Sequence, residues 1–277
     1  MRISDIIPLS DSIKLTTIPG KSSIISAIDH LRDNNFVPLL IEPRLEEEPP
    51  RPRVVSAFSV ISKMAQLPPS RLGAFLDSPA TETALSIGSI DEGQDLVSLF
   101  HVFETTTLGF AEVHRDNRST EVLMSVKNVL RLYDSNILSS DLVLNDVASS
   151  PVFSISRGTK LEKILREMLN RKFRRVQIAD TRVIVSDREI LSYLFQKDRL
   201  KKAEKSPERL LAGTLEEIQT RETPWFEGKV RLKDAAKMLS TKEHDSILTE
   251  RGLITPWDLT MKPWRLGELR IADKLSK

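Results

Sequence analysis

The 277-residue chain contains no cysteine. Disulfides, cysteine nucleophiles and cysteine-based zinc sites are therefore excluded, and the composition fits a reducing compartment. An excess of one charge is also missing, because 41 Lys and Arg residues are balanced by 39 Asp and Glu residues. This balance argues against a dedicated nucleic-acid-binding protein, which usually carries a strongly basic face.

Long apolar runs are absent as well. No stretch approaches the roughly 20 apolar residues that a membrane-spanning helix needs. The N-terminal sequence MRISDIIPLSDSIKL lacks the continuous apolar region of a signal peptide. We therefore expect a cytoplasmic protein that has no membrane partner. The four histidines stand far apart in the sequence, without the spacing of a metal-binding helix, so neither a metal site nor a required cofactor is predicted.

What the sequence does contain is an internal repeat. A short apolar strand, then Ser or Thr, then a short helix occurs four times, and the hydroxyl residues recur 69, 61 and 69 positions apart. Such regular spacing indicates duplicated units, which we number as copies one to four. Their hydroxyl residues are, in order, Ser56, Ser125, Ser186 and Thr255.

Copy three shows the order of elements most clearly. Residues 151–156 alternate like a strand, and Thr159 with Glu162 forms a capping box that is expected to open a helix. Apolar residues follow at helical spacing, and residues 174–185 then predict two strands joined by a turn. A second helix is expected from Asp187. The predicted fold class is α/β (mixed α+β), built from four β-α-β-β-α units.

A single unit of this kind exposes an apolar sheet face that is too large to remain unpaired. We therefore expect the copies to pack in pairs. The predicted division is an N-terminal module of copies one and two, residues 1–140, and a C-terminal module of copies three and four, residues 141–277. A charged helical linker at about residues 197–215 separates copies three and four, and its charges are expected to face solvent.

This pattern resembles the cystathionine β-synthase (CBS) domain family over nearly the whole chain. The strongest segments are SSPVFSISRGTKLEKILREMLNRKFRRVQIAD and RVIVSDREILSYL in copy three and GLITPWDL in copy four. The family motif ends in Gly, two apolar residues, Thr or Ser, any two residues and Asp. Copy four matches it with Gly252, Thr255 and Asp258. Copy three keeps the hydroxyl residue but has Val183 for Gly and Glu189 for Asp.

The resemblance implies a stand-alone protein with four CBS motifs in two tandem Bateman modules, similar in organisation to the gamma subunit of AMP-activated protein kinase. Such proteins are regulatory and are not enzymes. Their paired motifs bind adenosine-containing ligands, commonly AMP, ADP, ATP or S-adenosylmethionine. The resemblance also implies a homodimer and a regulated partner protein that the sequence does not identify.

The motif residues suit an adenosine ligand chemically. The carboxylates of Asp258 and Glu189 can each accept both hydrogen bonds of a ribose cis-diol, although Glu189 is longer by one methylene. Ser186 and Thr255 stand where a strand becomes a helix, a position that favours a phosphate. Copies one and two are diverged, and we expect weaker contributions from Ser56, Ser125 and Asn128.

Basic and apolar residues complete the predicted site. Arg174, Arg175 and Arg188 would supply positive charge, and the guanidinium group suits bidentate phosphate contact. The residues predicted to contact adenine are Ile155, Val176, Trp225 and Ile247.

Other interpretations of the same residues stay open. Thr or Ser followed at the third position by Asp or Glu is also an ordinary capping box. The basic run 171–175 also suits a solvated strand edge that prevents aggregation. The alternative function is a scaffold that kept the fold, lost its ligand and binds a protein or a nucleic acid. An enzyme is the least favoured reading, because no P-loop, nucleophile elbow or metal-ligand cluster appears.

Overall fold

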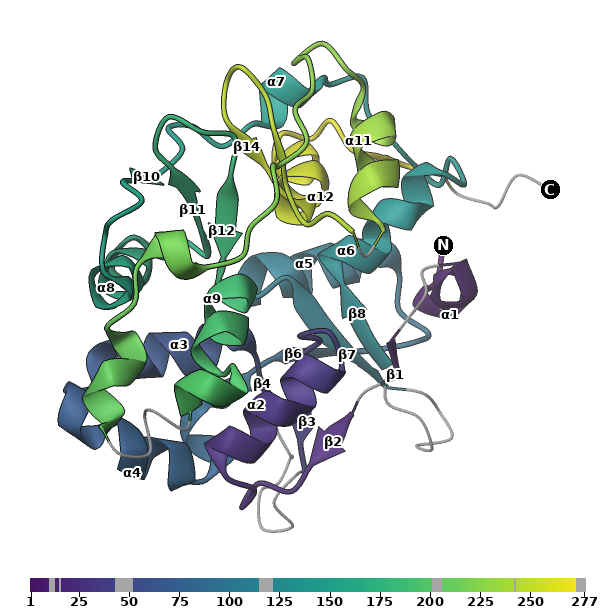
Figure 1. Ribbon diagram of the computed structural model, residues 1–277. Coiled ribbons are helices and arrows are strands. Elements are labelled where there is room, and N and C mark those ends of the chain that lie inside the picture. The colour runs from purple at the N-terminus through teal and green to yellow at the C-terminus, as the bar shows by residue number, and fades with distance from the viewer. Residues whose placement is uncertain are drawn as a thin grey trace. The chain divides into compact units, whose positions relative to one another are not determined.

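The computed structural model describes residues 1–9, 13–14, 16–42, 52–114, 122–200, 206–241 and 243–272, and Figure 1 labels its elements. The chain forms two compact units, and each unit combines two separated parts of the sequence. Unit 1 consists of Met1–Leu15, Ile87–Val152 and Thr223–Lys277, and unit 2 of Thr16–Ser86 and Phe153–Glu222. Unit 2 therefore contains copies one and three, and unit 1 contains copies two and four. The predicted division into modules 1–140 and 141–277 groups the copies differently and stays a prediction.

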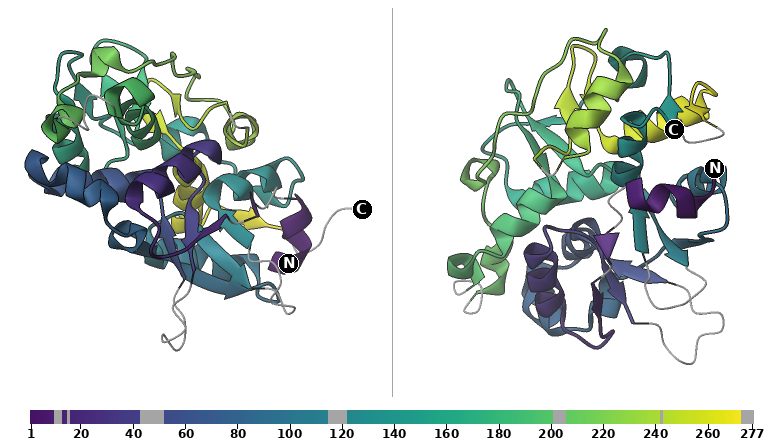
Figure 2. Two further views of the ribbon diagram at one scale, coloured as in Figure 1. Left: turned by 60° about the horizontal axis from the view of Figure 1, so that its bottom comes forward. Right: turned by 90° about the vertical axis from the view of Figure 1, so that its right-hand side faces the viewer.

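Copy one supplies the first half of unit 2. Its sheet has the order β2-β3-β4-β5, in which β2 and β3 are parallel and the other neighbours are antiparallel. Figure 2 shows the purple and blue elements of this copy lying together in both views. They are β2 (Thr17–Ile18), α2 (Ile24–Asp33), β3 (Leu39–Ile41), β4 (Arg53–Val55), α3 (Ala57–Gln66), η2 (Pro69–Arg71), α4 (Leu72–Asp77), η3 (Ala80–Thr83) and β5 (Leu85–Ser86).

Copy three supplies the second half of unit 2. It has the sheet order β10-β11-β12, with the first pair parallel and the second antiparallel. Its elements are β10 (Ser154–Ile155), α8 (Leu161–Arg171), β11 (Arg175–Ile178), β12 (Ile184–Ser186), α9 (Asp187–Leu194), η5 (Pro207–Leu211) and η6 (Leu215–Glu217).

The expected capping box at the start of α8 is wrong. The N-cap residue is Lys160, which makes no capping hydrogen bond with its side chain. The N–H of Leu161 instead donates to the carbonyl of Gly213 at 2.8 Å, and Thr159 Oγ1 lies 2.9 Å from Ser156 Oγ. The helix therefore begins one residue later than the local pattern predicted, and a backbone carbonyl distant in the sequence accepts from its first N–H group.

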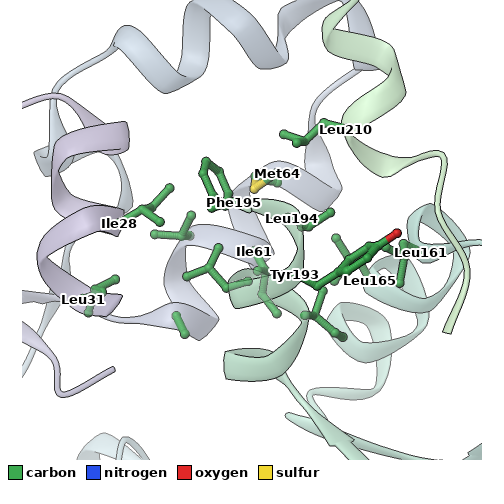
Figure 3. Packing of buried hydrophobic residues seen from close by; sticks show 14 of the residues in the cluster. Ile28, Leu31, Ile61, Met64, Leu161, Leu165, Tyr193, Leu194, Phe195 and Leu210 are labelled. Atoms are coloured by element: carbon green, nitrogen blue, oxygen red, sulfur yellow. The ribbon is translucent and has the colours of Figure 1, made fainter. Parts of the chain in front are cut away.

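The core of unit 2 joins copy one to copy three (Figure 3). Helix α3 contacts both α8 and α9. The apolar stripes of α2, α3, α8 and α9 meet there because residues three and four apart share one helix face. Within the predicted charged linker (about 197–215), Leu210, Leu211 and Leu215 are buried in this core, while residues 201–205 lie outside the described part of the chain. Figure 3 labels Ile28, Leu31, Ile61, Met64, Leu161, Leu165, Tyr193, Leu194, Phe195 and Leu210.

Copy two forms the larger sheet of unit 1, with the order β1-β8-β7-β6. Strands β6 and β7 are parallel, and the other neighbours are antiparallel. The elements from the start of the chain through copy two are α1 (Ile3–Ile6), η1 (Ile7–Leu9), β1 (Ile13–Lys14), β6 (Gly88–Asp91), α5 (Leu96–Thr106), β7 (Phe110–His114), β8 (Val122–Ser125), α6 (Val126–Val129), η4 (Leu130–Tyr133), β9 (Leu138–Ser139) and α7 (Leu144–Val147).

Copy four completes unit 1 with α11 (Leu232–Leu239), β13 (Ile247–Leu248), β14 (Leu253–Ile254), α12 (Pro256–Arg265) and β15 (Arg270–Ile271). Strand β13 is antiparallel to β14, and a parallel bridge from Trp225 to Leu248 takes the place of a first strand. The hydroxyl of Tyr133 donates to the carbonyl of Leu259 at 2.9 Å and so links copy two to copy four inside the core.

The structure therefore confirms the predicted fold class, a mixed α/β fold of four repeats. Copies one to three have the order β-α-β-β-α, and copy four has a single bridge in place of its first strand. In each of the four copies, the chain passes from a strand through a Ser or Thr directly into the second helix. Within the ranges that the structure describes, no helix is long and apolar enough to cross a membrane.

Candidate ligand-binding site

The predicted motif residues form a closed capping box in all four copies. The third residue after each Ser or Thr accepts a hydrogen bond from the Ser or Thr backbone N–H, at distances of 2.9, 2.9, 2.7 and 2.8 Å in copies one to four. Each box satisfies backbone donors that a helix start leaves without intrahelical partners. The motif therefore has a structural role in every copy, whether or not a copy also binds a ligand.

In copy three, the box lies at the start of α9, directly after β12 (Figure 1). Glu189 Oε2 accepts from the Ser186 N–H at 2.7 Å and from Ser186 Oγ at 3.0 Å. Ser186 is buried and Glu189 half-buried. Arg175 stands opposite Ser186 in the β11–β12 ladder, and side chains at opposed positions share one face of a sheet. Ser186, Glu189 and Arg175 are thus brought together, with Arg188 on the first turn of α9.

Arg174 is engaged within the protein. Its Nε and Nη2 donate to Asp187 Oδ2 at 3.1 and 2.8 Å. The Asp187 side chain is only 3% exposed, whereas that of Arg174 is 36% exposed. The Arg174 guanidinium also lies 5.5 Å from the ring centroid of Phe58. Arg174 therefore neutralises a buried carboxylate, and its predicted contact with a phosphate stays a prediction.

The two predicted adenine contacts of copy three differ in accessibility. Ile155, in β10, is half-buried and packs against the core of unit 2. Val176, in β11, is completely buried in that core. Only the Ile155 side chain therefore presents surface to a ligand in this structure.

In copy four, all the acceptor positions of Asp258 are engaged. Oδ2 accepts from the Thr255 N–H at 2.8 Å and from Thr255 Oγ1 at 2.7 Å. Oδ1 accepts from Ser149 Oγ at 2.7 Å and forms an ion pair with Lys262 Nζ at 3.1 Å. The Asp258 side chain is 5% exposed. A carboxylate offers about four lone-pair positions, and four donors take them here.

The predicted adenine contacts of copy four also differ. Trp225 is 43% exposed, one of the few large apolar side chains with this much accessible surface. Ile247, in β13, is completely buried in the core of unit 1. An exposed indole can stack on a base, whereas Ile247 serves packing in this structure.

The corresponding residues of copies one and two are uncharged, and all of them except the half-buried Ser125 are buried. Ser56 is 4% and Ser59 5% exposed, and Asn128 is 7% exposed. Asn128 Oδ1 accepts from both the N–H and the hydroxyl of Ser125. These boxes lack the negative charge that would bind a diol strongly.

Sequence reasoning missed the groups that surround Asp258. Lys262 stands four residues after Asp258, and this spacing places the two side chains on one helix face, so the pair was detectable in the sequence. Ser149 carried no signal, since it lies 109 positions from Asp258 and reaches it only through the fold. Asp187, the partner of Arg174, was likewise not anticipated.

Elsewhere in unit 2, a pocket of about 390 Å³ lies near the start of β4, whereas Ser56 follows the end of that strand. It is lined by Pro19, Gly20, Lys21, Glu42, Arg53, Pro79 and Thr81. Among the residues that the structure describes, no group of three or more His, Cys, Asp or Glu side chains gathers to hold a metal ion.

No protein-family model matches the sequence, and no curated protein matches it. Solved structures do match. Protein MJ1225 from Methanocaldococcus jannaschii, proposed as an archaeal homologue of γ-AMPK, has a TM-score of 0.80 and 18% identity over 95% of this chain and 100% of that chain. An uncharacterized conserved protein from Pyrococcus horikoshii has a TM-score of 0.54 and 13% identity over 94% and 98% of the two chains.

A CBS domain protein from Pyrobaculum aerophilum complexed with AMP matches over 46% of this chain and 89% of its own, with 19% identity and a TM-score of 0.35. The likenesses to MJ1225 and to the Pyrococcus horikoshii protein both extend over almost the whole chain and so include all four repeat copies. The chain therefore has the fold of the CBS-domain proteins, with four CBS units.

Proposed function

We propose that this protein is a non-enzymatic regulatory protein that binds an adenosine-containing ligand through its third CBS copy. The observation that carries the proposal is the group formed by Ser186, Glu189, Arg175 and Arg188 at the junction of β12 and α9. It combines a carboxylate, a hydroxyl and two guanidinium groups on neighbouring positions of copy three.

Each group has a matching feature on a nucleotide. The Glu189 carboxylate suits a ribose diol, and a hydrogen bond to a charged group contributes about 1.5–3 kcal/mol. Arg175 and Arg188 suit a phosphate, which is also favoured by the positive end of the α9 dipole. Ile155 offers accessible apolar surface for a base. The fold supports the same assignment, since the CBS domain protein from Pyrobaculum aerophilum was solved with AMP.

The choice among AMP, ADP, ATP and S-adenosylmethionine, the homodimer, the cytoplasmic location and the regulated partner protein remain predictions made from the sequence. The same holds for the absence of a required cofactor. The proposal concerns the ligand class and the copy that binds it.

Isothermal titration calorimetry with these four ligands tests the proposal. We expect saturable binding by the wild-type chain and about tenfold weaker binding by Glu189→Gln, which keeps a capping acceptor but loses the charge that strengthens a diol contact. Glu162→Gln is the matched control, because Glu162 pairs with Arg166 on the solvent-facing side of α8. Absence of both heat and a rise in melting temperature with every ligand would refute the proposal.

The second candidate is a binding scaffold without a small ligand. The observation in its favour is that the boxes of copies one and two are uncharged and, except for the half-buried Ser125, buried. Binding to DNA or RNA that weakens steeply with salt would support a nucleic-acid scaffold. Absence of such binding even at low salt would leave a protein scaffold.

A further inference from the structure

The ammonium group of Lys262 is as fully engaged as the carboxylate it faces. Lys262 Nζ donates to the carbonyl of Val147 at 2.7 Å and to Ser149 Oγ at 2.9 Å, and it forms the ion pair with Asp258 Oδ1 at 3.1 Å. An ammonium group has three donors, and all three have acceptors here. Ser149 both accepts from Lys262 and donates to Asp258. The side chains of Asp258, Lys262 and Ser149 thus serve as hydrogen-bonding and ionic partners for one another. We call these three side chains the copy-four network.

The copy-four network belongs entirely to unit 1 and holds two of its segments together. Residues 147–149 belong to the segment Ile87–Val152 of unit 1, and Asp258 and Lys262 come from α12 of copy four. Backbone bonds fix the same segment, since the N–H groups of Ser149 and Leu253 each donate to the other residue's carbonyl, at 2.8 and 3.1 Å. Ser149 and Val147 are therefore held beside α12 independently of the side-chain contacts.

A ribose diol would have to displace this network in order to bind Asp258. The diol offers two neutral hydroxyl donors, whereas the two donors already on Oδ1 are a hydroxyl and a full positive charge. If the two diol hydroxyls replaced the Ser149 hydroxyl and the Lys262 ammonium on Oδ1, the ion pair would be lost. The Lys262 ammonium and the Val147 carbonyl would be left without their partners, and no additional hydrogen bond would be gained. Burial of the Asp258 side chain strengthens the interaction that would be lost.

We infer that Lys262, held by Ser149 and the Val147 carbonyl, acts as an internal ligand of the copy-four carboxylate and closes this copy to ribose ligands. The inference rests on the proposed function in that it concerns the same ligand class. Its consequence is that Asp258, although it belongs to the copy that best matches the motif, does not bind a ribose in the wild type. Lys262 is a specificity-determining residue, and removing its charge opens copy four.

The test compares the number of bound AMP molecules per chain, measured by equilibrium dialysis, in the wild type and in Lys262→Met. Methionine keeps most of the side-chain volume but has no donor. We expect one additional AMP site per chain in Lys262→Met, absent again from the double variant Lys262→Met with Asp258→Asn. The matched control is Arg166→Met, which removes the cation of an exposed ion pair at the same i,i+4 spacing and should leave the number of sites unchanged.

Two results would overturn the inference: an unchanged number of sites in folded Lys262→Met, or loss of a site from the wild type on Asp258→Asn substitution. If Lys262→Met does not fold, the reaction rate of Lys262 with an acylating reagent decides. That rate should stay the same in the wild type at saturating AMP, and an AMP-dependent increase would show that the ligand displaces Lys262. A wild type that binds none of the four adenosine ligands refutes the proposed function, yet the inference still stands or falls on whether Lys262→Met gains an AMP site.

Discussion

Asp258→Ala and Ser59→Ala remove the equivalent motif residue from copies four and one, and we expect very different losses of stability. Each substitution removes the acceptor of one capping box, a loss of about 1 kcal/mol. Asp258→Ala also leaves the Lys262 ammonium and the Ser149 hydroxyl without their acceptor. Removing one partner of a buried ion pair destabilises a protein by about 3–5 kcal/mol.

The lower end of that range applies, because the Lys262 side chain is 30% exposed and water can hydrate the freed ammonium. We therefore expect the free energy of unfolding to fall by about 4 kcal/mol for Asp258→Ala and by about 1 kcal/mol for Ser59→Ala. The difference of about 3 kcal/mol is roughly a 150-fold change in the unfolding equilibrium constant.

Urea unfolding measures both effects. The three tryptophans, Trp225, Trp257 and Trp264, all belong to unit 1, so tryptophan fluorescence follows the unit that contains Asp258, and far-ultraviolet circular dichroism follows both units. Asp258→Ala should lower the midpoint of the fluorescence transition by more than Ser59→Ala lowers any transition. A midpoint shift for Asp258→Ala no larger than that for Ser59→Ala would refute the account of the copy-four network.

Two further predictions concern stability. Gly252→Ala should lower the melting temperature strongly, because Gly252 has φ +156° and an added Cβ would lie 2.2 Å from the Ser149 carbonyl oxygen. The control is Gly158→Ala, because Gly158 has open space around it. Equal melting temperatures for the two variants would contradict this prediction. The pKa of Glu217 lies below its ordinary value, first because the Tyr193 hydroxyl donates to its carboxylate. A pKa lowered by folding stabilises the protein above the unfolded-state pKa, and this stabilisation is lost as the pH falls through the folded-state pKa. Glu217→Gln should therefore flatten the acid side of a stability-versus-pH curve, and an unchanged acid side would show that this carboxylate does not contribute.

The sequence by itself determined the repeat, the step from strand to second helix in each copy, and the capping box of copies three and four as one of two interpretations of the motif. These features are local: periodicity decides between helix and strand, and a hydroxyl residue three positions before a polar acceptor marks a helix start. The prediction at Thr159 failed because the helix begins one residue later, after Lys160, and the N–H of Leu161 donates to the carbonyl of Gly213, which is distant in the sequence.

Only the tertiary structure decided which motif residues are accessible and how the copies share their cores. Asp258 fits the family motif best in sequence, yet its carboxylate is saturated by Ser149 and Lys262, and Ser149 comes from a segment 109 positions away. Val176 and Ile247 look like any apolar strand residues until packing buries both completely. Distant parts of the chain decide whether a side chain is buried and whether its hydrogen-bonding positions are occupied. A local sequence pattern contains no information about such neighbours.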